Sequence, residues 1–158
     1  MRCFVEKIRE EMARPDPRRR VLPGARSLLE ELERREGVHL GLLTGNLEAG
    51  ARAKLDPFDL NRYFASGGFA SDDPDRGKIA NVAWNRLRDL AGIAFEPLDV
   101  TVVGDTVHDV ECAKVNGFRA VAVDSGWAIR SDLEQANPDA LLDDLSDLNR
   151  SLTALGIE

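Results

Sequence analysis

The most constraining feature of the sequence is a short apolar segment that ends in a glycine and an aspartate. Residues 100–103 are almost wholly apolar and β-branched, which predicts a strand buried on both faces of a parallel sheet. Gly104 ends this strand, and a helical pattern runs from Val107 until Asn116 and Gly117 close it. A second apolar strand is predicted at residues 118–123. This order of elements predicts an α/β fold with a mainly parallel sheet.

Two carboxylates stand where the first of these strands gives way to the helix. Asp105 directly follows the strand, and Asp109 lies in the first helical turn. Ligands of open α/β sheets bind beyond the carboxyl ends of the strands, and oxygen-rich sites suit Mg²⁺. The alternative is that Asp105 is the helix N-cap and Asp109 a first-turn acid favoured by the helix dipole. For this motif taken alone, the second interpretation is preferred.

Composition excludes several classes of protein. The chain has 158 residues, 43% of them hydrophobic, which is enough for one globular domain with a core. The net charge of −7 argues against nucleic-acid and membrane partners, and there is no apolar stretch long enough to span a membrane. The first residues do not resemble a signal peptide. Two cysteines form neither a disulfide framework nor a metal site, so a cytoplasmic location is expected.

Further helices and strands are predicted on both sides of this segment. Helices are expected at residues 2–13, 25–35, 47–55, 131–136 and 145–155 and from Lys78 onward, with strands at 38–43 and 138–142. Residues 56–71 are expected to be rich in turns, with Tyr63, Phe64 and Phe69 as core anchors. Cys112 is expected to pack as a small hydrophobe.

Two other polar motifs have a functional and a structural interpretation. Thr44, Gly45 and Asn46 follow the strand at 38–43 and can offer a hydroxyl and backbone N–H groups to an anion. Equally, Thr44 or Asn46 can cap the next helix. Lys78 is unfavourable for the dipole at a helix start, which suggests a residue retained for an anion. A solvated surface lysine near three acids remains the alternative.

Taken together, these motifs resemble three of the four motifs of the haloacid dehalogenase-like (HAD) hydrolases, in the family's order. They are residues 42–46, Lys78 and the block from Gly104 to Asp109, and the chain is most similar to the phosphoglycolate phosphatase-like branch. Residues 121–127 and 138–140 also resemble the family's C-terminal half. The resemblance implies a three-layer Rossmann-like core at residues 21–158, preceded by a helical remnant of a cap domain at residues 1–20.

The resemblance also implies a Mg²⁺-dependent phosphatase of small phosphorylated metabolites. In that family an aspartate attacks phosphorus, an aspartyl-phosphate forms, and water hydrolyses it. By resemblance, Thr44 would hydrogen-bond the phosphoryl group together with the backbone of Gly45 and Asn46, and Lys78 would neutralise charge. Asp105 would bind Mg²⁺ directly, and Asp109 directly or through water.

The family's first motif, an apolar strand ending in Asp-x-Asp-Gly-Thr, is missing. Asp16 is the only aspartate before Asp56, and it lies between two prolines, so no residue is assigned as the nucleophile. In the family this strand is central in the sheet, between the strands that end at Thr44 and Asp105. We therefore expect a chain truncated at its N-terminus. Its neighbouring strands must close up, accept another segment or separate, and unpaired strand edges favour instability or self-association.

Three interpretations remain open at this point. The first is a phosphatase in its full-length form. The second is a catalytically incomplete core that only binds phosphate and Mg²⁺, and the third is a half-enzyme completed by another chain.

Overall fold

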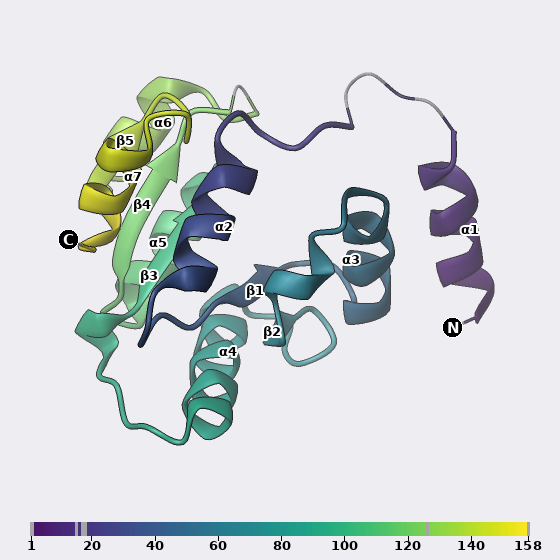
Figure 1. Cartoon of the computed structure of the whole chain (residues 1–158), viewed down its shortest axis with the longest axis horizontal. Coiled ribbons are helices and arrows are strands. Elements are labelled where there is room, and N and C mark those ends of the chain that lie inside the picture. Colours follow the sequence, from purple (N-terminus) through teal and green to yellow (C-terminus); the bar gives the residue numbers. More distant parts are fainter. Residues whose placement is uncertain (1, 15, 17–18, 126, 158) are drawn as a thin grey trace. The chain divides into compact units, whose positions relative to one another are not determined.

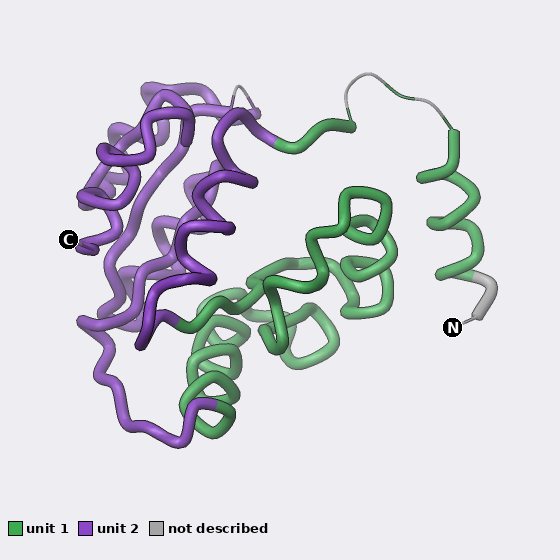
Figure 2. Tube along the Cα trace, in the orientation of Figure 1, with its two compact units in different colours: residues 1–21, 39–90 green, residues 22–38, 91–158 purple. Residues whose placement is uncertain are grey.

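The computed structural model describes residues 2–14, 16, 19–125 and 127–157, which form two compact units (Figure 2). The first unit comprises residues 1–21 and 39–90, and the second comprises residues 22–38 and 91–158. Each unit contains its own parallel sheet. The α/β class and the parallel pairing predicted from the sequence are confirmed.

The first unit is built on two strands, β1 (Gly41–Thr44) and β2 (Ser66–Phe69), which pair in parallel with Thr44 opposite Phe69 (Figure 1). Its helices are α1 (Arg2–Met12), α3 (Glu48–Leu55) and α4 (Arg76–Ala91), with 3₁₀ turns η1 (Asp56–Phe58) and η2 (Asn61–Tyr63). Helix α1 packs against α3. Its origin as a cap remnant stays a prediction.

Strand β2 corrects the expectation of a purely turn-rich segment at residues 56–71. Its sequence, Ser-Gly-Gly-Phe, has no β-branched run and gave no strand signal. The two glycines are there because the backbones come close: a Cβ on Gly67 would overlap the carbonyl of Leu42, and one on Gly68 would overlap that of Ile79. Tyr63 and Phe69 are buried core residues as predicted. Close packing, rather than β propensity, therefore explains this strand.

The second unit holds three parallel strands in the order β3 (Thr101–Gly104), β4 (Arg119–Val123) and β5 (Ala140–Leu142). Its helices are α2 (Ala25–Arg34), α5 (Val107–Val115), α6 (Arg130–Gln135) and α7 (Leu148–Leu155), with the 3₁₀ turn η3 (Pro97–Asp99). Helices α5 and α7 both contact β4 (Figure 1). Cys112 in α5 is buried, as expected of a packed hydrophobe.

Strand β3 differs from its prediction because its two faces are unlike. Val102 is buried, whereas Val103, which points to the opposite face, is 42% exposed. Within the described residues, β3 pairs only with β4 and β1 only with β2, so each of them has one unpaired edge. The apolar run therefore predicted the strand but not which of its faces is covered. None of the helices in the described residues is long and apolar enough to cross a bilayer.

The turn before α2 depends on a glycine. Gly24 has a left-handed backbone conformation with φ of 78°, and a Cβ there would overlap the backbone carbonyl of Leu145. Leu145 N–H in turn donates to the carbonyl of Pro23 at 3.2 Å. The start of α2 and the loop before α7 are thereby held in direct backbone contact. Gly37 has a similar φ of 80°, but nothing lies within 4 Å of a Cβ at that position.

These two glycines form a matched pair for a stability measurement. Gly37→Ala is expected to cost about 1 kcal/mol, the price of a left-handed alanine. Gly24→Ala is expected to cost about 3 kcal/mol or more, because backbone overlap adds to that conformational term. Urea unfolding followed by circular dichroism measures both. Equal losses for the two variants would contradict the proposed contact with Leu145.

Candidate active site

The turn after β1 is organised by hydrogen bonds among its own side chains. Thr44 Oγ1 accepts from the backbone N–H of Asn46 at 3.2 Å and from its Nδ2 at 2.9 Å. Lys54 Nζ donates to Asn46 Oδ1 at 2.9 Å. With both of its lone pairs occupied, the Thr44 hydroxyl keeps its hydrogen for a further acceptor. This arrangement suits an anion ligand.

The helix-capping alternative for this turn is not what the structure shows. Helix α3 has Leu47 at its N-cap, with no side-chain capping bond. Neither Thr44 nor Asn46 therefore caps it. The polar side chains of the turn bond to each other and to the Lys54 side chain, and not to the first backbone N–H groups of α3.

Lys78 lies in the first turn of helix α4. Helix α4 begins at Arg76, two residues earlier than predicted, so Lys78 is its third residue. Its side chain is 69% exposed, and Nζ lies 3.7 Å from Asp73 Oδ2. In this conformation it is a solvated lysine paired with an acid. Its role as a phosphate ligand stays a prediction.

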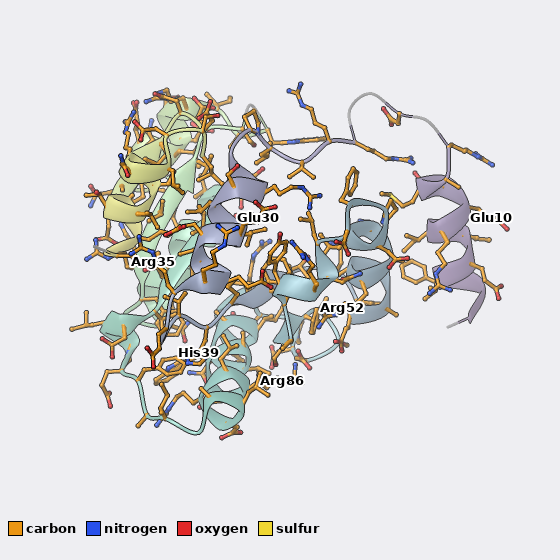
Figure 3. All side chains as sticks on the ribbon, viewed as in Figure 1. Glu10, Glu30, Arg35, His39, Arg52 and Arg86 are labelled. Atoms are coloured by element: carbon orange, nitrogen blue, oxygen red, sulfur yellow. The ribbon has the colours of Figure 1, made fainter. Side chains whose placement is uncertain are left out.

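An ion pair fixes the loop that leads into α4. Arg86 Nη1 and Nη2 both donate to the carboxylate of Asp72 at 2.8 Å, and Nη1 also donates to the carbonyl of Gly67 at 2.9 Å. Asp72 Oδ2 further accepts from the backbone N–H of Phe69. Figure 3 labels Arg86 on α4. Hydrogen bonding to Arg86 lowers the pKa of Asp72, and hydrogen bonding to Asp72 raises the pKa of Arg86.

Arg76 was not among the predicted site residues of this unit. Its Nη1 atom lies 3.8 Å from the position that a Cβ on Gly45 would occupy, so its guanidinium is beside the turn after β1. The signal was present in the sequence. Arg76 precedes the apolar residues Ile79, Ala80 and Ala83 at helical spacing, which places it on the inward face of α4.

In the second unit, Asp109 is held at the start of α5. The N-cap of this helix is Thr106, not Asp105, and it forms a capping box with Asp109. Asp109 Oδ2 accepts from the N–H of Thr106 at 3.1 Å and from its hydroxyl at 2.8 Å, and Asp109 is only 6% exposed. A Cβ on Gly104 would overlap the Asp109 carboxylate, so only glycine fits there. The capping role of Asp109 is confirmed, and its role as a metal ligand stays a prediction.

Asp105 is held by the loop that follows β4. Ser125 Oγ donates to Asp105 Oδ2 at 2.7 Å. Ser125 was not predicted as a site residue, although its position just past a parallel strand placed it at the right edge of the sheet. Asp105 is half-buried and leads directly from the carboxyl end of β3. Its carboxylate is thus oriented by a neighbouring strand's loop.

A second cluster of charges ties this loop to the one after β5. Arg130 Nη1 donates to Asp124 at 3.1 Å and to Asp143 at 2.7 Å. The hydrogen bond from Arg130 lowers the pKa of Asp143, and the same bond is the main reason that the pKa of Arg130 is raised. The pairs are solvent-exposed, so they contribute little to the free energy of unfolding, although they connect the two loops.

The carboxylates of the second unit fit Mg²⁺ better than a transition metal. Within the described residues, no group of three or more His, Cys, Asp or Glu side chains is arranged to hold a metal ion. Mg²⁺ is commonly held by one or two carboxylates together with water and substrate phosphate, whereas structural zinc needs four protein ligands. Asp105 and Asp109, both held by hydrogen bonds, are the carboxylates that the sequence predicts for such a site, and this role stays a prediction. Thr44, Gly45, Asn46 and Lys78 belong to the first unit.

Comparison with known proteins decides the family. The sequence profile of the haloacid dehalogenase-like hydrolases matches residues 3–117. The chain belongs to the haloacid dehalogenase-like hydrolases. It is similar to a phosphoglycolate phosphatase of Synechococcus elongatus, with 31% identity over 152 residues, covering 96% of this chain and 68% of the relative. With phosphoglycolate phosphatase 1 of Pseudomonas aeruginosa it shares 34% identity over 130 residues, 81% of this chain and 46% of the relative.

Solved structures of this hydrolase family agree on the fold. The crystal structure of a predicted phosphoglycolate phosphatase from Haemophilus somnus 129pt matches with a TM-score of 0.73 and 21% identity, covering 94% of this chain and 63% of that one. The match extends the shared fold over nearly the whole of this hydrolase chain. The curated relatives and this structure are all longer than the region they share with it.

The Asp72–Arg86 pair gives a pH-dependent prediction for this hydrolase. Asp72→Asn is expected to destabilise the chain by about 1–2 kcal/mol at pH 7, between the values for exposed ion pairs and for charged hydrogen bonds. Because the pKa of Asp72 is lower in the folded chain, this contribution is complete above the unfolded value of about 3.9 and is lost as the pH falls through the folded value. Urea unfolding between pH 3 and 7 measures it.

The matched control is Asp89→Asn, which removes an exposed aspartate from α4, the helix that carries Arg86. Its unfolding curves are expected to follow those of the original chain at every pH. A constant difference between Asp72→Asn and the original chain down to pH 3 would contradict the assigned pKa direction.

Proposed function

We propose that this HAD-like hydrolase forms the core of a Mg²⁺-dependent phosphatase that acts on small phosphorylated metabolites of the phosphoglycolate type. The observation that carries the proposal is the pair of oriented carboxylates, Asp105 and Asp109, at the carboxyl end of β3. Support for the substrate class comes from the relatives, which are named as phosphoglycolate phosphatases. The net charge of −7 favours a small-molecule substrate over nucleic acid.

Each residue of the proposed site has a definite task. Asp105 and Asp109 would hold Mg²⁺, which when bound neutralises phosphate charge and orients the group for in-line attack. The Thr44 hydroxyl and the backbone N–H groups of Gly45 and Asn46 would bind phosphoryl oxygens. Lys78, on a long exposed side chain, would add positive charge near the phosphate. Ser125 and Thr106 orient the two carboxylates.

The reaction still requires a nucleophile. In this family an aspartate oxygen forms a bond to phosphorus as the bond to the leaving oxygen breaks, and water then attacks the aspartyl-phosphate and releases phosphate. No aspartate of residues 1–55 has the necessary position: Asp16, the only one, forms no strand and pairs with Arg19 at 3.8 Å. We propose that a further polypeptide segment supplies this residue. Until it does, the chain binds phosphate and Mg²⁺ without turnover.

The proposed metal site can be tested without turnover. Asp105→Asn is expected to weaken Mg²⁺ binding at least tenfold, because it removes one of two carboxylate charges at nearly constant shape. Isothermal titration with MgCl₂ measures this. Asp132→Asn, at an exposed aspartate of α6, is the matched control and is expected to bind as the original chain does. Equal affinities for Asp105→Asn and the control would rule out Asp105 as a ligand.

The unpaired edge of β3 allows a test of the proposed further segment. A synthetic peptide with an apolar strand followed by Asp-x-Asp-Gly-Thr is expected to add to a free strand edge and to restore Mg²⁺-dependent hydrolysis of p-nitrophenyl phosphate. The chain alone is expected to be inactive and, in sedimentation velocity, to self-associate through its unpaired edges.

A peptide with its first Asp changed to Asn is the control, expected to bind without restoring activity. Hydrolysis by the chain alone that Asp105→Asn abolishes would show that a nucleophile is already present among the 158 residues. A sharp two-state melt of a clean monomer would argue against the exposed edges.

A further inference from the structure

A lysine on α3 is connected to the turn after β1 by two successive hydrogen bonds. Lys54 Nζ donates to Asn46 Oδ1 at 2.9 Å, and Asn46 Nδ2 donates to Thr44 Oγ1 at 2.9 Å. The backbone N–H of Asn46 also donates to Thr44 Oγ1, at 3.2 Å. The contacts therefore run from an ammonium group on the helix to the hydroxyl for which phosphate binding is proposed.

The direction of these hydrogen bonds follows from the chemistry of the Lys54 side chain. An ammonium group donates and cannot accept, so the end of the Asn46 amide that faces it must be the oxygen. The other end, the NH₂ group, then faces Thr44 Oγ1 and donates to it. Because the backbone N–H of Asn46 takes the second lone pair, the hydrogen of the Thr44 hydroxyl is available only to a group outside this turn.

Without a donor at position 54, the Asn46 amide is free to take the opposite orientation. Its oxygen and its NH₂ group are nearly equal in size, so hydrogen-bond partners alone select between the two orientations. In the opposite orientation the amide oxygen lies beside Thr44 Oγ1 and accepts the hydroxyl hydrogen. An anion that binds at the turn must first break that bond, which lowers its affinity.

The fold brings Lys54 to the turn because α3 begins directly after it. Leu47 is the N-cap of α3, and Lys54 lies in its last turn. Side chains of an α-helix tilt toward its N-terminus, so the long lysine side chain extends back toward Asn46. Within the described residues Lys54 forms no ion pair, and its ammonium group bonds to a neutral amide. Pairing with a carboxylate therefore does not explain its position.

We infer that Lys54 is a positioning residue of the proposed phosphate site. It fixes the orientation of the Asn46 amide, and the amide directs the hydrogen of the Thr44 hydroxyl toward the bound anion. This inference rests on the proposed function and extends it to a residue that none of the sequence motifs included. Lys54 acts through its neighbours and without contact to the phosphate. A hydroxyl that is oriented in advance loses less freedom on binding, which favours affinity.

The competing explanation is that Lys54 acts only through its charge. A lysine in the last turn of a helix interacts favourably with the helix dipole, and any nearby cation attracts an anion through space. Neither effect depends on the Thr44 hydroxyl. The two explanations therefore differ in whether the contribution of Lys54 disappears when that hydroxyl is removed.

The test is a double-mutant cycle between positions 54 and 44, with inorganic phosphate titrated into the full chain by calorimetry in the presence of MgCl₂. Lys54→Met is expected to weaken binding about fivefold, the share of one neutral hydrogen bond. In a Thr44→Val background, which keeps the side-chain shape, the same substitution is expected to change affinity by less than about twofold. Lys54→Arg keeps a donor and is expected to retain most of the affinity. Equal losses in both backgrounds would overturn the inference.

A second measurement needs no phosphate. In the original chain, NMR is expected to show a nuclear Overhauser contact between the Asn46 side-chain NH₂ and the side-chain protons of Thr44. This contact is expected to be lost in Lys54→Met, because the amide turns, and to return in Lys54→Arg. An unchanged contact in Lys54→Met would overturn the inference. Should the Thr44→Val chain bind too weakly to titrate, this measurement decides.

The control is Lys7→Met, which removes an exposed lysine from α1 in the same unit. It is expected to match the original chain in phosphate affinity and in the NMR contact, and circular dichroism establishes that each variant is folded. Absence of phosphate binding by the original chain would overturn the proposed function and this inference with it. Binding by the original chain with equal losses in the cycle would overturn this inference alone.

Discussion

Parallel strand pairing is the constraint on which the remaining features of this chain depend. Because β1 and β2 run in the same direction, as do β3, β4 and β5, the carboxyl ends within each sheet meet at one edge. Parallel strands must be connected by crossovers, so every strand is followed by a loop at that edge. In the second unit this geometry brings the loop after β4 to the one after β3, where Ser125 meets Asp105. A polar site is a direct consequence of the strand direction.

At the carboxyl ends of these strands, short hydrogen-bonded motifs orient the polar groups. The capping box between Thr106 and Asp109 both starts α5 and fixes a carboxylate that would otherwise be costly to bury. The pair of Asp72 and Arg86 secures the loop that carries the start of α4. Glycine makes these arrangements possible at Gly104, where any side chain would overlap Asp109. The capping role of Asp109 does not conflict with the metal-binding role proposed for it, which explains why the two interpretations of this motif were hard to separate.

The family membership and the unpaired strand edges both concern the strand that carries the nucleophile in this family. The chain belongs to the HAD-like hydrolases, yet it spans only part of the curated relatives it matches. No aspartate in its first 55 residues follows an apolar strand, and β1 and β3 each lack a partner on one edge within the described residues. An added strand that carries the nucleophile would satisfy the backbone and the chemistry together. The proposed binding of Mg²⁺ and the proposed turnover can therefore be measured separately.

The sequence by itself determined the α/β class, most helices and the polar residues at the strand ends. These depend on local signals: apolar runs, helical spacing, and glycine or aspartate at strand ends. It did not reveal β2, because Gly67 and Gly68 are chosen for close backbone approach to Leu42 and Ile79. Nor did it reveal that Val103 is exposed, since the exposure of a strand face depends on which elements pack against that face. The helical spacing that separates Arg76 from Lys78 was present in the sequence, but only the tertiary structure decided that α4 begins at Arg76 and which of its faces packs on the sheet.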